Sequence, residues 1–269
     1  MTATGVAALI GLAAMQTSAP PLAPSSAWSI DYGEAKCTLS RSFGPKDQTV
    51  TLGLQPAIAE GLATIVLLVP KTTKLASGYG NGEIEVSPDR TVKMQYESQP
   101  VPGLDQMVVR VYVEDTLVDT IFAVPALRIK VGRTPLPAIA VTGAGKALTA
   151  LATCRTKLMV AWGVDPAIWA KATVRAEAIG PEDWIGFNDY PADALRENRQ
   201  GETAMLWKIG TNGRVSDCRI VKSSGTPSLD SASCAAMTRH GVYRPARDAS
   251  GRPIVSWGSK SVQWRLPMN

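Results

Sequence analysis

The sequence predicts an α+β protein with two domains, a β-rich N-terminal domain that ends in a long helix and a smaller C-terminal domain. Three observations support this expectation. Apolar segments with strand patterns occupy residues 28–132, a helical pattern covers residues 143–162, and helical and strand patterns alternate after residue 190. A chain of 269 residues, of which 45% are hydrophobic, can also bury two modest cores.

Residues 1–27 have the features of a signal peptide. Their apolar run, residues 5–15, is 11 residues long. This length suits the apolar core of a signal peptide and is too short to cross a bilayer, for which a helix needs about 20 residues. Small residues suited to cleavage end at Ala19 and at Ala27. Because Pro20 disfavours the first site, we expect cleavage after Ala27 and export of the mature chain.

The N-terminal domain, residues 28–164, is expected to be built mainly of strands. Its final segment, residues 143–162, has apolar residues at helical spacing and is followed by Gly163, which predicts one long helix. The stretch "TGAGKALT" resembles a phosphate-binding loop, but Ala140 and Ala147 replace its required Gly and Ser or Thr, so no nucleotide site is predicted. The predicted strands lie in residues 48–55, 63–70, 82–86, 91–96 and 107–115.

Residues 165–189 are predicted to be a connector with a short helix in 166–179, and residues 190–269 form the C-terminal domain. Its elements follow in the order helix, strand, strand, helix, strand, which predicts a three-stranded antiparallel sheet with helices on one face. The final strand contains Gly258, where we expect a bulge or a bend. The predicted elements are a helix in 190–200, strands in 202–210 and 215–224 joined by an Asn212-Gly213 turn, a helix in 227–240 and a strand in 252–266.

The chain has four cysteines, at positions 37, 154, 218 and 234. They show no CxxC motif and no Cys/His spacing typical of a metal site, so no metal is expected. In an exported chain an even number of cysteines favours disulfides. We expect Cys37 to pair with Cys154, and Cys218, on a strand, to pair with Cys234, on the following helix. Two free buried thiols at 218 and 234 are the alternative.

No group of residues has the pattern of a catalytic site. The single histidine, His240, lies at the end of a predicted helix, where the helix dipole favours a cation, so we interpret it as a capping residue. No GxSxG motif is present. The carboxylate pairs Glu83/Glu85 and Asp115/Asp119 lie on strands or turns without a further site signature. We therefore predict no catalytic residue and no cofactor, and we expect that the protein is not an enzyme.

Six short motifs of the C-terminal domain occur together in one order. With this order and spacing, about 78 residues, from about 190 to 267, resemble the C-terminal domain of the TonB family of energy transducers. The motifs are Tyr190-Pro191, Gly213 with Val215, Ser223-Ser224-Gly225, Leu229-Asp230, Tyr243-Arg-Pro-Ala246, and Gly251 with Pro253.

The resemblance implies that the protein binds a partner through its last strand. In the TonB family this strand receives a short extended segment of an outer-membrane receptor, the TonB box, and the proteins act in the Gram-negative cell envelope. The chain is therefore expected in the periplasm, with membrane association left open, and its function is linked to transmembrane transport. Core or edge-blocking roles are the alternative for the two tryptophans of the last strand. The implied binding residues are Val255, Trp257, Ser261, Val262, Gln263 and Trp264, together with Tyr190 and Pro191.

The rest of the chain sets limits on this expectation. TonB transducers join the motor proteins ExbB and ExbD through a membrane-spanning helix and a Pro-rich spacer; neither is evident here, so this partnership is not expected. Residues 190–269 contain 12 basic and 6 acidic residues, and because these charges are scattered, they suit a neutral or acidic peptide segment and not nucleic acid. The alternative function is a cell-envelope hydrolase or wall-modifying enzyme with its site in the N-terminal domain.

Overall fold

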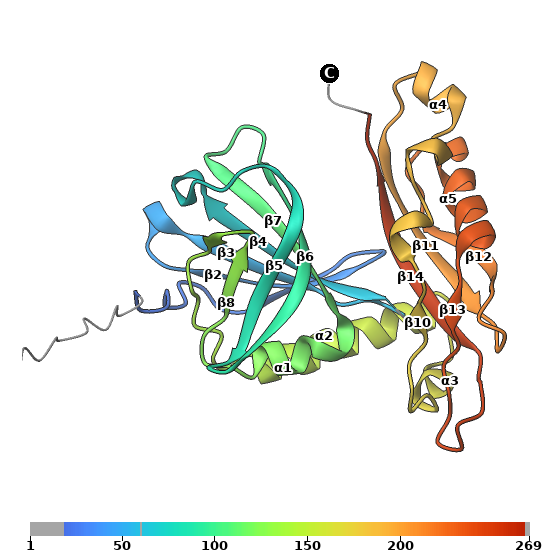
Figure 1. The fold of residues 1–269 in the computed structure, drawn as a ribbon, viewed down its shortest axis with the longest axis horizontal. Helices are drawn as coiled ribbons and strands as arrows, with labels where there is room; N and C mark the ends of the chain where they lie inside the picture. Colours follow the sequence, from blue (N-terminus) through green and yellow to red (C-terminus); the bar gives the residue numbers. More distant parts are fainter. Residues whose placement is uncertain (1–18, 60, 267–269) are drawn as a thin grey trace, which may run out of the picture.

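The computed structural model describes residues 19–59 and 61–266, which form two bodies side by side (Figure 1). The N-terminal domain contains one curved sheet of nine antiparallel strands, in the order β1-β2-β3-β4-β7-β6-β5-β8-β9. Each predicted strand segment corresponds to one of these strands; the segments 63–70, 82–86 and 91–96 lie within β4, β5 and β6, whereas 48–55 begins two residues before β3 and 107–115 ends one residue after β7. The strands are β1 (Ser29–Tyr32), β2 (Cys37–Phe43), β3 (Val50–Gln55), β4 (Leu62–Pro70), β5 (Gly78–Ser87), β6 (Arg90–Pro100), β7 (Gln106–Glu114), β8 (Arg128–Val131) and β9 (Thr134–Pro135).

Two helices accompany this sheet. The short α1 (Val118–Phe122) packs against β5, and α2 (Gly145–Ala161) packs against β2 and β1. The predicted helix is thus confirmed, and Gly163 follows it with a φ of 72°, as expected for a glycine beyond a helix end. Alternate residues of the strands point into the core, together with Leu151, Cys154 and Met159 of α2.

The residues just before β1 are part of the N-terminal domain. The N–H of Leu22 donates to the carbonyl of Ala138 (2.8 Å), and the N–H of Ser25 donates to the carbonyl of Ser42 (2.9 Å). Residues 1–18 lie outside the described residues, and the signal-peptide boundary stays a prediction.

The connector is less helical than predicted. The helix α3 (Pro166–Ala170) covers only the first part of residues 166–179. The short strand β10 (Glu177–Ala178) follows and pairs with β13 (Tyr243–Arg244) of the C-terminal domain. This pairing explains the difference, because backbone in a strand ladder cannot continue a helix.

The C-terminal domain has the predicted order of elements, and its sheet has the order β12-β11-β14. The helix α5 packs against β12 and β11, and the short α4 packs against α5. The bounds of α5 agree with the predicted helix, whereas α4 is shorter than predicted and the last strand begins at residue 256, not at residue 252. The elements are α4 (Ala192–Arg196), β11 (Gly201–Ile209), β12 (Val215–Lys222), α5 (Pro227–His240) and β14 (Ser256–Trp264).

The sheet of the C-terminal domain is covered on both faces. Met205 and Trp207 of β11 pack on the side of α5, in one cluster with Met237. Leu206, between them, points to the other face and belongs to the core of the N-terminal domain, and Val221 and Trp257 pack against that core. The two domains therefore share a continuous apolar contact across the second face of this sheet.

The prediction of a bulge at Gly258 is wrong. The register of β14 with β11 runs without a shift from Gly201↔Trp264 to Ile209↔Ser256, and Gly258 lies opposite Trp207. A Cβ at Gly258 would overlap the indole of Trp207. The glycine is therefore explained by the space that Trp207 occupies, not by an irregularity of the strand.

Candidate functional site

The strand β14 is an edge strand, since among the described strands it pairs only with β11. Gly61 belongs to the loop between β3 and β4 of the N-terminal domain, and a Cβ added to it would lie 3.3 Å from the carbonyl oxygen of Ser259. Because the Ser259 carbonyl points toward this loop, it points away from β11. In an antiparallel strand the N–H and C=O of one residue point the same way, and the direction alternates along the strand. We infer that Ser261 and Gln263 also direct their main-chain groups to the outer edge.

The predicted binding residues of the last strand fall into different environments. Ser261 and Gln263 are exposed, and Val255 and Val262 are half-buried. Val262 packs toward the side of α5. Trp257 is also half-buried, but it packs against the N-terminal core. The C-terminal half of β14 therefore presents the polar side chains of Ser261 and Gln263 to solvent.

The side chains of Tyr190 and Trp264, two of the predicted binding residues, are buried in the core. They are only 7% and 4% exposed, and their rings meet edge to face with centroids 5.1 Å apart. The indole N–H of Trp264 donates to Ser233 Oγ (2.9 Å), and the Tyr190 hydroxyl donates to the carbonyl of Arg199 (2.5 Å). Pro191 is half-buried directly before α4. These aromatic side chains hold β14 and the start of α4 on α5.

Besides the packing of Trp257, polar contacts join the N-terminal domain to Ser259 of β14 and to Arg265 just after it. The N–H of Ala59 in the β3–β4 loop donates to Ser259 Oγ (3.1 Å). Arg265 donates to Gln99 of β6 (2.9 Å) and lies 3.6 Å from the carboxylate of Glu97. Sequence analysis missed these residues because no local pattern marks a contact between positions that are 166 or more residues apart.

Glu97 is the centre of a polar group on the outer face of the nine-stranded sheet. It faces Arg110 on β7 (3.8 Å) as well as Arg265, and it accepts a hydrogen bond from the Tyr112 hydroxyl (3.3 Å). Burial, followed by the neighbouring Glu97 charge, raises the pKa of Tyr112 to about 12. Tyr112 therefore stays a hydrogen-bond donor at physiological pH and keeps Glu97 in place for Arg265.

Asp230, from the predicted Leu229-Asp230 motif, ties the start of α5 to the sheet. Its carboxylate accepts hydrogen bonds from the hydroxyls of Ser223 and Ser224, from the N–H of Ser224 and from the hydroxyl of Thr203 on β11. Burial acts to raise the pKa of Asp230, but these hydrogen bonds outweigh burial and hold the pKa below its usual value. The Ser223-Ser224-Gly225 motif thus contributes to the framework through its hydrogen bonds with Asp230.

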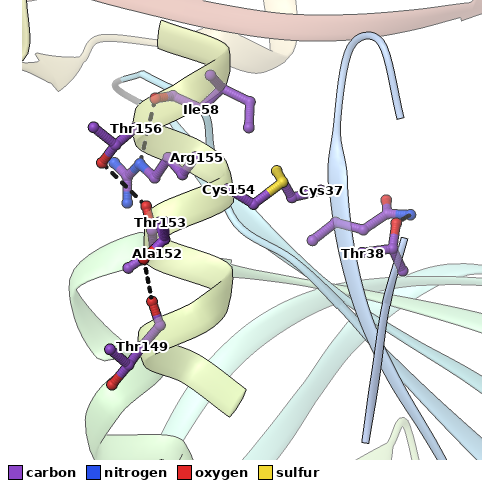
Figure 2. The surroundings of a disulfide bond; sticks show 10 residues. Cys37, Thr38, Ile58, Thr149, Ala152, Thr153, Cys154, Arg155 and Thr156 are labelled. Carbon is purple, nitrogen blue, oxygen red and sulfur yellow. Dashed lines mark hydrogen bonds between the residues drawn. A yellow bond between two sulfur atoms is a disulfide. The ribbon is translucent and has the colours of Figure 1, made fainter. Parts of the chain in front are cut away.

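Both predicted disulfides are confirmed. Cys218 of β12 and Cys234 of α5 are bonded, with Cα atoms 5.5 Å apart. Cys37 of β2 and Cys154 of α2 are bonded as well, with Cα atoms 6.2 Å apart. Figure 2 shows this second bond between the helix and the strand, with Arg155 beside it. The free-thiol alternative is therefore not what the structure shows.

The Arg155 side chain reinforces the same region. It donates to the carbonyl of Ile58 (3.3 Å; Figure 2), in the loop that reaches β14. It also donates to Asp115 Oδ2 (2.6 Å). Asp115 also accepts a hydrogen bond from the N–H of Ala57 (3.1 Å). The loop that approaches Ser259 is therefore anchored to the N-terminal core.

The N-terminal domain also contains a cavity. The pairing of β6 with β7 ends at Gln95↔Tyr112, and this cavity of about 580 Å³ opens where the two strands separate. Its lining includes the carboxylates of Glu83 and Glu114 and the ammonium of Lys93, but no serine, cysteine or histidine. In residues 19–59 and 61–266, no three His, Cys, Asp or Glu side chains gather as a metal site. No helix in this part of the chain is long and apolar enough to span a membrane.

Residues 188–266 match the family model described as Gram-negative bacterial TonB protein C-terminal. The C-terminal domain is a TonB C-terminal domain. This family consists of binding and transducing domains of the Gram-negative cell envelope that interact with outer-membrane receptors or other envelope proteins, and it is not enzymatic. The match leaves residues 1–187 unassigned. No curated protein matches the chain.

Proposed function

We propose that this protein works in the periplasm and binds an extended segment of an outer-membrane transporter, or of another envelope partner, as an added strand. The observation that carries the proposal is the edge of β14. Among the described strands it pairs only with β11, and it directs the main-chain groups of Ser261 and Gln263 outward. Such an edge can bind an extended peptide through main-chain hydrogen bonds, while exposed side chains select the sequence.

The charges near β14 favour a neutral or acidic segment. Lys260 is exposed, and the side chain of Arg265 is 44% exposed although it contacts Gln99 and Glu97. Both cations flank the outward positions Ser261 and Gln263. An acidic residue in the partner would therefore gain favourable electrostatic interactions, mainly as a faster association rate.

The proposed role is binding linked to transmembrane transport. A folded β-domain precedes the TonB C-terminal domain in this chain and packs against its sheet. The connector also pairs with the C-terminal domain through β10 and β13. Partnership with ExbB and ExbD is not part of the proposal.

A proline at position 261 tests strand addition. We expect Ser261→Pro to remain folded, because proline is tolerated where the N–H faces away from the neighbouring strand. It should lose affinity for a peptide selected on the wild type from a display library by about tenfold or more, since it removes a hydrogen bond and clashes with the incoming strand. Ser261→Ala, which keeps the N–H, is the matched control and should bind as the wild type does.

The outcome against the proposal is a folded Ser261→Pro protein that binds the selected peptide with full affinity. Thermal unfolding and peptide affinity are measured on the same samples of the full chain. Gln263→Pro probes the second outward position in the same way, so that the result does not depend on a single substitution.

An envelope hydrolase is the second candidate function. The observation that favours it is the cavity between β6 and β7, with Glu83 and Glu114 in its lining. Two carboxylates across a cleft are the minimum that glycoside hydrolysis requires. Release of sugar fragments from peptidoglycan by the purified protein, lost in both Glu83→Gln and Glu114→Gln, would establish this activity.

A further inference from the structure

We propose that the N-terminal β-domain forms the second wall of the peptide site, so that a bound segment lies between β14 and the outer face of the nine-stranded sheet. This inference rests on the proposed function of β14 and adds to it, because the family match begins only at residue 188. Figure 1 shows β14 on the side of the C-terminal domain that faces the nine-stranded sheet.

The β3–β4 loop closes one end of this site. Ala59 donates to Ser259 Oγ, and Gly61 lies against the Ser259 carbonyl, which is the next outward main-chain group before Ser261. Because Asp115 and Arg155 anchor the loop, a strand that pairs with Ser261 cannot extend past Ser259 without displacing it. The loop therefore sets where pairing stops.

Arg265 and β6 mark the other end. The Arg265 guanidinium bridges from the end of β14 to Gln99 and Glu97, and Glu97 is itself held by Arg110 and Tyr112. About half of the Arg265 side chain stays exposed, at 44%. The Arg265 guanidinium can therefore donate hydrogen bonds to a carboxylate of the partner while it keeps its contact with the N-terminal domain.

The two contacts bracket residues 260–264. At a rise of about 3.3 Å per residue, this window accommodates roughly five residues of an extended chain. At the loop end, Leu62 follows Gly61 and is 50% exposed, which offers an apolar surface. At the other end Arg265 offers a positive charge. The site thus fits a short extended peptide of about five residues with an apolar side chain near Leu62 and an acidic one near Arg265.

Site-specific photo-crosslinking in cells that express the full chain tests this arrangement. A photoreactive amino acid is placed singly at Ser261 or Gln263 on β14 and at Leu62 or Gln99 on the N-terminal domain. Exposed positions on other surfaces, Ser216 on β12 and Thr91 on β6, serve as controls. Crosslinked partner peptides are identified by mass spectrometry, and thermal unfolding checks that each variant is folded.

The expected result is that all four test positions crosslink to one short stretch of one partner protein, with Leu62 and Gln99 reaching opposite ends of that stretch, and that the controls do not. Crosslinks from Ser261 and Gln263 without any from Leu62 or Gln99 would overturn the second wall and leave strand addition standing. Crosslinks from neither set, or only to a second copy of this chain, would overturn both proposals.

Discussion

At the scale of single residues, Gly258 shows how the core of the C-terminal domain determines a position on its edge strand. Trp207 is 1% exposed and lies opposite Gly258 in the ladder between β11 and β14. Its indole occupies the space that a side chain at position 258 would need. The glycine thus serves packing, and it does so without breaking the regular edge on which peptide binding depends.

Replacing this glycine should destabilise the protein. In Gly258→Ala the new Cβ overlaps Trp207, and overpacking of this kind typically costs about 1–3 kcal/mol. Urea unfolding of the full chain measures the change, with Ser261→Ala, an exposed position of the same strand, as the control. A Gly258→Ala protein as stable as the wild type would contradict the packing explanation.

Asp230 makes the stability of the C-terminal domain depend on pH. Because its hydrogen bonds hold the pKa of Asp230 below the ordinary value in the folded state, its contribution is fully present above the unfolded value of about 4 and is lost as the pH falls through the lowered folded value. We expect the wild type to lose more unfolding free energy between neutral pH and strongly acidic pH than Asp230→Asn.

Urea unfolding across this pH range measures the difference between the two proteins. Asp217→Asn, which changes a carboxylate at an exposed position of β12, is the matched control and should follow the wild type. Parallel pH profiles for the wild type and Asp230→Asn would show that Asp230 does not stabilise the fold through its charge.

At the scale of elements, the disulfide between β12 and α5 fixes the helix on the sheet that carries the binding edge. It joins residues 16 positions apart, so it closes a loop of 17 residues. α5 in turn carries Ser233, which accepts the hydrogen bond of Trp264 at the end of β14. The covalent link therefore supports the edge strand through α5.

Removing this disulfide should lower the free energy of unfolding by about 3 kcal/mol in the chain-entropy model. The double variant Cys218→Ser/Cys234→Ser tests this under oxidising conditions, with the Cys37–Cys154 bond intact. Under reducing conditions, where neither protein keeps a disulfide, the difference should largely vanish. A double variant as stable as the oxidised wild type would contradict the role assigned to this bond.

At the scale of the whole molecule, the two domains meet over the face of the C-terminal sheet that α5 does not cover. Leu206 enters the N-terminal core, and Lys36 forms an ion pair with Glu202 (3.4 Å) beside this contact. Arg219 donates to the carbonyl of Trp162 at the end of α2, and its guanidinium lies 5.4 Å from the centre of the Trp257 ring. This packing explains why the N-terminal domain reaches the binding edge.

Local signals in the sequence predicted much of the C-terminal domain. The helical segment 227–240 and the Asn212-Gly213 turn between two strands are short-range features, and the structure confirms both elements. The two disulfides were predicted because an exported chain with an even number of cysteines tends to form disulfide bonds in an oxidising compartment. The whole domain also resembled its family through six short motifs, which the family match confirms.

The remaining features depend on contacts between distant residues. Trp264 and Tyr190 looked like binding residues, because their mutual packing against α5 has no local pattern. The helix expected in residues 166–179 was shortened because β10 pairs with β13, more than 60 positions later. The second wall of the site depends on Ala59, Glu97 and Gln99, whose sequence surroundings show only ordinary strands and turns.

The central claim, that a partner adds a strand to β14, is tested most directly by amide hydrogen exchange. The selected peptide is added to the full chain, and exchange is measured residue by residue by NMR. We expect the amides of Ser261 and Gln263, which face outward, to become protected, while that of Val262, which faces β11, changes little. Peptide binding that leaves the Ser261 and Gln263 amides unprotected would contradict this claim.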